Sequence, residues 1–113
     1  MQLLIIVLNK EEYLEKLMSL LIEAGISGAT ISDSQGIGHY LAYEVPIFAG
    51  LRQMMGEGKT VNKTILALLD DDKGFDQFKE LLLEEDIDFT KPGMGVVITV
   101  PVNEAIKSER EVK

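Results

Sequence analysis

Near the start of the chain, the spacing of the apolar residues changes from that of a strand to that of a helix. Residues 2–8 form a continuous run rich in Leu, Ile and Val, which is typical of a strand buried on both faces. Over residues 10–24 the apolar positions recur at helical spacing, and they are Leu14, Leu17, Met18, Leu21 and Ile22. The pattern predicts a strand followed by a helix, with Asn9 as the helix cap and Gly25 at the helix end.

The same alternation returns in the second half of the chain. Residues 29–33 predict a second strand, and residues 61–69 predict a third whose last part is buried. The acidic residues 70–72 open a second helix, whose apolar face consists of Phe75, Phe78, Leu81 and Leu82. Residues 95–102 predict a last strand, so each half of the chain is expected to form a β-α-β unit.

Two β-α-β units predict an α+β fold of the ferredoxin-like type, in which four antiparallel strands carry both helices on one face. We expect one domain over residues 1–113, with a long loop at about 34–60 and a charged tail at about 103–113. The continuously apolar strands imply that the other face of the sheet is also covered, and self-association is the simplest cover.

The long loop contains an apolar pattern of its own. Several glycines and Pro46 interrupt any long element there. Within residues 44–58, however, large apolar side chains have the spacing of a short helix, and these are Ile47, Phe48, Leu51, Met54 and Met55. This predicted face either packs on the protein's own assembly or docks a partner protein, a role that flexible methionine side chains suit.

Composition narrows the class of protein. The chain of 113 residues has a net charge of −8, which argues against binding nucleic acid or a bare anionic membrane surface. No apolar run approaches the roughly 20 residues that span a bilayer, and no signal peptide is recognisable at the start. The absence of cysteine excludes disulfides and thiol catalysis. We therefore expect a cytoplasmic protein that does not insert directly into a membrane.

The residues that most often carry chemistry are scarce. His39 is the only histidine, and we interpret it as a surface loop residue without a special role. The acidic run at residues 70–72 lacks the spaced ligands of a calcium loop and is better explained as a solvated helix start. We predict no catalytic residues, no metal ligands and no enzymatic activity. The sequence identifies no cofactor.

Nearly the whole chain, apart from the interior of the long loop, resembles the nitrogen-regulatory PII signal proteins. The resemblance lies in the order of elements and in three motifs, Gly25-Ile-Ser-Gly-Ala-Thr-Ile-Ser32, Gly36-Ile-Gly38 and Pro92-Gly-Met-Gly-Val-Val-Ile-Thr-Val-Pro-Val-Asn-Glu-Ala-Ile106. It implies a homotrimer whose sheets face inward and whose small effectors, often adenine nucleotides, bind between subunits. It also implies that the long loop regulates a partner protein, and a membrane transporter is the partner class it favours.

Carried over residue by residue, the resemblance implies a ligand site made of Thr30, Gly36 and Gly38 on one side, with Gly93, Gly95 and Lys107 on the other.

Three further positions depart from the family's pattern. Val96 stands where a lysine is usual, Glu109 where an arginine is usual, and Tyr40 where a glutamine is usual. Because a triphosphate requires such cations, we expect a ligand with fewer negative charges than ATP, or no nucleotide. The loop also lacks the family's tyrosine-bearing modification motif. An alternative reading is a small-molecule or divalent-metal-binding module of the same fold, such as a cation-tolerance-like protein or an amino-acid-binding regulatory domain.

Overall fold

The structure is a computed structural model, and it describes residues 1–50 and 62–108. The strands are β1 (Gln2–Leu8), β2 (Ala29–Ser34), β3 (Asn62–Leu69) and β4 (Gly95–Pro101). The helices are α1 (Leu14–Glu23), α2 (Ile37–Glu44) and α4 (Lys73–Glu84), with 3₁₀ turns at Glu11–Tyr13 and Pro46–Phe48. These elements follow the predicted order, with one helix added after β2.

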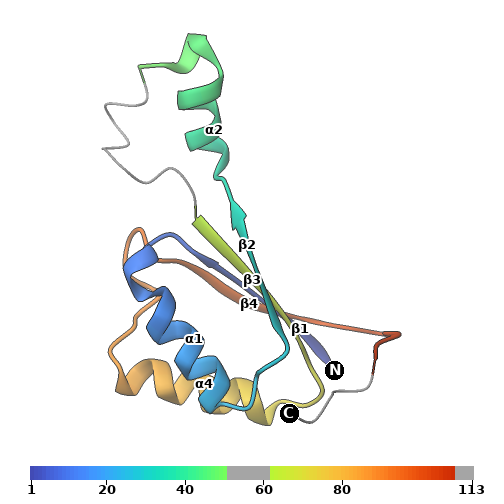
Figure 1. The fold of residues 1–113 in the computed structure, drawn as a ribbon. Coiled ribbons are helices and arrows are strands. Elements are labelled where there is room, and N and C mark those ends of the chain that lie inside the picture. The colour runs from blue at the N-terminus through green and yellow to red at the C-terminus, as the bar shows by residue number, and fades with distance from the viewer. Residues whose placement is uncertain (51–61, 109–113) are drawn as a thin grey trace.

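The four strands form one antiparallel sheet in the order β2-β3-β1-β4, as Figure 1 shows. The prediction of an α+β fold with a four-stranded antiparallel sheet is confirmed. Helices α1 and α4 lie together against one face of this sheet (Figure 1). Strands β2 and β4 are its two edges, so their residues approach one another only across β3 and β1.

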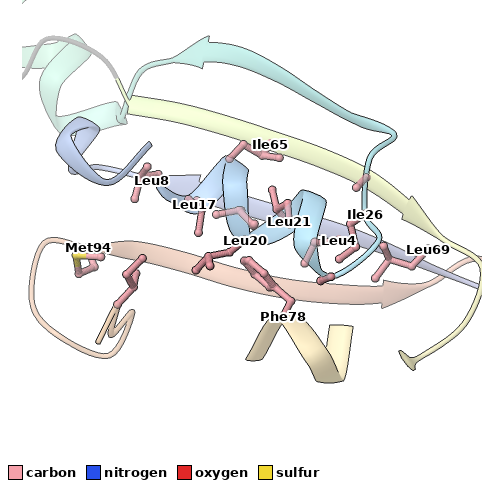
Figure 2. Close-up of a cluster of buried hydrophobic side chains, with 14 residues drawn as sticks. Leu4, Leu8, Leu17, Leu20, Leu21, Ile26, Ile65, Leu69, Phe78 and Met94 are labelled. Atoms are coloured by element: carbon pink, nitrogen blue, oxygen red, sulfur yellow. The ribbon is translucent and has the colours of Figure 1, made fainter. Parts of the chain in front are cut away.

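The core lies between the sheet and the two helices. Alternate residues of β1 and β3 point toward the helices, and Leu4, Ile6 and Ile65 are fully buried. Leu17 and Leu21 of α1 and Phe78 of α4 pack against them, together with the rest of the cluster in Figure 2. Gly25 ends α1 with a φ of 82°, the left-handed conformation predicted for it.

The opposite face of the sheet is apolar along β1, β4 and the second half of β3, whereas Thr64 of β3 and the adjacent β2 residues Thr30 and Ser32 make its β2 side polar. It carries no helix among the described residues. The strand register aligns Ile5 of β1 with Leu66 of β3 and Ile98 of β4. Leu66 and Ile98 are 41% and 42% exposed. The neighbouring rows add Leu3, Leu68, Val100, Val7 and Val96. We call this surface, made of the residues named here, the bare sheet face.

Two local predictions are wrong. Asn9 does not cap a helix, since the chain first makes the turn Glu11–Tyr13 and neither this turn nor α1 has a side-chain cap. The Asn9 side chain instead accepts a hydrogen bond from Asn62 of β3. The segment just after β2 is also not irregular, because Ile37–Glu44 forms α2. Gly36 starts this helix in an extended conformation and without a side-chain cap, so the sequence carries little signal for it.

Candidate functional site

A row of hydrogen-bonded polar groups crosses one end of the sheet. The Ser34 hydroxyl at the end of β2 donates to Asn62 Oδ1 at 2.6 Å, and Asn62 Nδ2 donates to Asn9 Oδ1 at 2.9 Å. The Asn9 backbone N–H then donates to the carbonyl of Met94, just before β4, at 2.9 Å. Thr64 Oγ1 lies 2.6 Å from Ser34 Oγ. Because the single Ser34 proton is already used, the Thr64 hydroxyl donates in that pair.

At the same end of the sheet, an ion-pair cluster links β2 to β3 and to the turn before α1. Lys63 of β3 bonds Asp33 of β2 and lies 3.5 Å from Glu11 in the turn before α1. The hydrogen bond to Asp33 is the main reason that the pKa of Lys63 is raised above its ordinary value. Lys63 therefore stays charged at neutral pH and ties the end of β2 to the start of α1.

A glycine turn forms the β4 side of the same end. Gly95 has a φ of 127°, and a Cβ added there would lie 1.8 Å from the Val7 carbonyl oxygen. Only glycine fits this close approach of β4 to β1. Gly93 has a φ of 80°, and a Cβ there would meet only Lys10 Cε, at 3.7 Å. The glycine at 95 thus has a packing cause, whereas the space around Gly93 is open apart from the lysine stem.

The turn is braced by Asp88. Both the backbone N–H and the hydroxyl of Thr90 donate to Asp88 Oδ1, at 2.9 and 2.6 Å. These bonds, the hydroxyl bond first, lower the pKa of Asp88, and the charge of Lys91 acts in the same direction. The charged carboxylate of Asp88 therefore fixes Thr90, at the start of the loop that carries Gly93 and Gly95.

One chain does not bring the predicted ligand residues together. Gly36 and Gly38 follow β2, whereas Gly93 precedes β4 and Gly95 begins it, at the same end but on opposite edges of the sheet. Three strand spacings separate these edges, which amounts to about 14 Å. Thr30 lies within β2, opposite Leu66, and is exposed.

Lys107 lies at the other end of the sheet. It pairs with Asp70, which directly follows β3. Strand β4 separates it from Gly95, and its seven residues span about 23 Å. The predicted set could therefore surround one ligand only if different copies of the chain supplied its parts.

The structure describes two of the three residues that depart from the PII pattern. Val96 lies on the bare sheet face opposite Val7 and is 44% exposed. Tyr40 is in α2 and is 49% exposed. Glu109 lies outside the described residues. At the Val96 position a lysine would extend across the bare sheet face, so its absence leaves that face apolar.

Helix α2 and the turn Pro46–Phe48 project from the sheet beyond β2 (Figure 1). Of the predicted partner-binding residues, Ile47 is 84% exposed and Phe48 is 41% exposed. Pro46 occupies the start of the turn, where its missing N–H costs no hydrogen bond. The remaining predicted members of this face, Leu51, Met54 and Met55, lie outside the described residues.

His39 lies in α2 and not in a loop, which corrects its predicted setting. Its ring stacks on Tyr43 with 4.4 Å between centroids, and Gln35 Nε2 is 2.7 Å from its Nδ1. Among residues 1–50 and 62–108, no group of three or more His, Cys, Asp or Glu side chains could hold a metal ion. The histidine therefore packs on Tyr43 of its own helix and against Gln35 just before that helix.

Sequence reasoning missed two features of the surface. One is the polar row, for which the only sequence signal is polar residues at strand ends. The other is a groove of about 480 Å³ between α4 and β4, lined by apolar groups that include Phe75, Leu82, Phe89 and Val97. Phe75 and Leu82 were assigned to the core face of the helix, and they also border this groove.

Compared with models of known protein families and with curated proteins, the chain matches none of them. No helix in the described part of the chain is long and apolar enough to cross a membrane.

Proposed function

We propose that this chain is a PII-like signalling protein of the ferredoxin-like fold, which assembles as a homotrimer in the cytoplasm. It binds a small effector between subunits and regulates a partner protein, and it is not an enzyme. The strand order β2-β3-β1-β4, with α1 and α4 on one face, supports the ferredoxin-like arrangement. The resemblance of the glycine motifs supports the family.

The bare sheet face is the observation that carries the assembly part of the proposal. Three adjacent strands present aligned aliphatic side chains, with Ile5, Leu66 and Ile98 in the middle row. Burying one such side chain fully contributes about 1.5–3 kcal/mol. A contiguous surface of this kind is typical of a protein–protein interface. A ligand site made of Gly36, Gly38, Gly93 and Gly95 requires in addition that the β2 edge of one sheet lies beside the β4 edge of another copy in the trimer.

The partner contact is assigned to the projecting element. Ile47 and Phe48 expose apolar surface on a segment that extends away from the sheet. Because this segment lies outside the proposed trimer interface, it is available to a second protein, and a membrane transporter is the class that the resemblance favours.

Sedimentation of two isoleucine variants tests the assembly. The unmodified chain should sediment at three times its 12.5 kDa mass. Ile98→Lys places a charge in the middle of the bare sheet face and should yield a folded monomer, because an unpaired charge is costly to bury. Ile47→Lys is the matched control, since Ile47 is exposed on the projecting element, and it should remain a trimer.

A monomeric unmodified chain would refute the proposal. Dissociation by Ile47→Lys would instead show that the projecting element packs on the assembly and does not face a partner. A thermal-shift panel of amino acids and divalent cations tests the alternative module, for which strong stabilisation by one of these ligands is the expected sign.

A further inference from the structure

The groove between α4 and β4 is an apolar cavity of the size that binds small molecules. Its volume is about 480 Å³, which lies within the roughly 300–1,000 Å³ of typical ligand pockets. Phe75 and Leu82 of α4, Val97 of β4 and Phe89 of the loop between these elements line it. Because β4 is an edge strand of the sheet, no described strand closes the groove on that side.

The groove is separate from the surfaces already assigned. Val97 is paired with Ile6 of β1, and paired residues of neighbouring strands share a face of the sheet. Since Ile6 is fully buried beneath the helices, Val97 lies on the helix side, opposite to the bare sheet face. Gly93 and Gly95 are not among the residues that line the groove. A ligand in this groove would therefore occupy a site other than the one expected between subunits.

The charges along the groove are not balanced. Lys79 Nζ lies 5.0 Å from the centre of the Phe75 ring and 3.5 Å from the carboxylate of Asp76, so its charge is already engaged. Just after α4, the carboxylates of Asp86 and Asp88 both border the groove. Neither of them makes an ion pair within residues 1–50 and 62–108. The charges that still lack a partner in the groove are therefore negative.

Asp88 is the carboxylate better placed to receive a cation, because it is half-buried. Thr90 donates only to its Oδ1, and its Oδ2 makes no hydrogen bond in the described part of the chain. The two bonds from Thr90, and the charge of Lys91 to a smaller degree, lower the pKa of Asp88, so it is ionised at neutral pH. Because water is partly excluded there, a charge is attracted more strongly than at the open surface.

We propose that this groove binds a small organic amine, whose apolar body lies among the aromatic and aliphatic side chains and whose ammonium group meets Asp88 and Asp86. The apolar lining disfavours a bare, strongly hydrated metal ion, and the two carboxylates disfavour an anion such as a nucleotide. The net charge of −8 also raises the local concentration of cations. The proposal does not depend on the trimer, and it adds a second ligand to the effector expected at the glycine motifs.

Amide NMR spectra of the isotope-labelled full chain test this proposal with three probes of similar shape. The probes are phenethylamine, the neutral phenethyl alcohol and the anion hydrocinnamate, each titrated at neutral pH and constant ionic strength. We expect saturable shifts of the Thr90 and Val97 amide signals with the amine. The alcohol should bind about tenfold more weakly, because it lacks the charge-assisted hydrogen bond, and the anion should bind more weakly still.

Three variants locate the charge that the amine recognises. Asp88→Asn should weaken amine binding about tenfold and leave alcohol binding nearly unchanged, which a general loss of structure would not do. Asp86→Asn, at an exposed carboxylate, should weaken amine binding about two- to fivefold, and asparagine tolerates the φ of 56° at this position. Glu84→Gln is the matched control, since it removes the same charge from the end of α4 but does not line the groove. It should change the affinity less than about twofold.

The proposal is overturned if the amine binds no more tightly than the alcohol, or if its shifts do not include Thr90 and Val97. It is also overturned if Glu84→Gln weakens amine binding as much as Asp88→Asn, because the effect would then come from the net charge of the chain. If Asp88→Asn does not fold, Asp86→Asn decides, and amine binding equal to that of the unmodified chain overturns the proposal. A monomer that binds the amine as expected refutes the proposed trimer and supports the groove site.

Discussion

Gly95 is the position at which β4 comes closest to β1, and replacing it with alanine tests how these strands pack. A Cβ there would lie 1.8 Å from the oxygen and 2.9 Å from the carbon of the Val7 carbonyl. Both are backbone atoms of β1, one of the two central strands, so no side chain can rotate away to make room. The φ of 127° is also a conformation that alanine rarely adopts.

Two costs combine in Gly95→Ala. Holding a residue other than glycine in such a conformation costs about 1–3 kcal/mol. Separating β1 from β4 to relieve the contact breaks at least one ladder hydrogen bond and leaves its groups poorly paired, which adds about 1–3 kcal/mol. We expect a loss of about 2–6 kcal/mol, a large part of the roughly 5–15 kcal/mol by which a domain is stable.

Urea unfolding followed by circular dichroism measures this loss. All variants are compared at one protein concentration, because self-association would add to the apparent stability. Gly93→Ala is the control, since its φ is also positive but its Cβ would meet only the flexible Lys10 stem at 3.7 Å. It should cost only the backbone strain, about 1–2 kcal/mol.

Equal stability of the two alanine variants would refute the steric argument. The close approach of Val7 would then not be the reason for a glycine at position 95. Contact with a ligand would become the better explanation.

Two further predictions concern the pH dependence of stability. Asp88 has a pKa below its ordinary 3.8 because of Thr90, so its contribution is complete above that pH and is lost as the pH falls through the lower folded value. Asp88→Asn should therefore be less stable than the unmodified chain at neutral pH in urea unfolding, and the two should converge in acid. Lys63 has a pKa above its ordinary 10.5, chiefly because of its hydrogen bond to Asp33, so its contribution is complete below pH 10.5 and is lost as the pH rises through the folded value. Lys63→Met should be less stable at neutral pH and converge with the unmodified chain at high pH, and a difference that stays constant with pH would contradict either argument.

The amino-acid sequence by itself determined the elements that bury a continuous apolar face. Strands β1, β3 and β4 and helix α4 lie where the periodicity places them, because the spacing of apolar residues records which side of each element is buried. Gly25 was predictable for a similar local reason, since the end of α1 requires a left-handed residue. The α+β class follows from the order of these elements.

Only the tertiary structure decided which polar groups meet. Asn9 has the sequence of a helix cap, but the register of β1 beside β3 brings Asn62 to its side chain. Lys10 and Gly93 are far apart in the chain, and they meet because β1 ends where β4 begins. Local pattern cannot report such pairs, since strand pairing joins distant residues. The same pairing places Gly36 and Gly93 on opposite edges of the sheet, which is why a site containing both needs more than one copy of the chain.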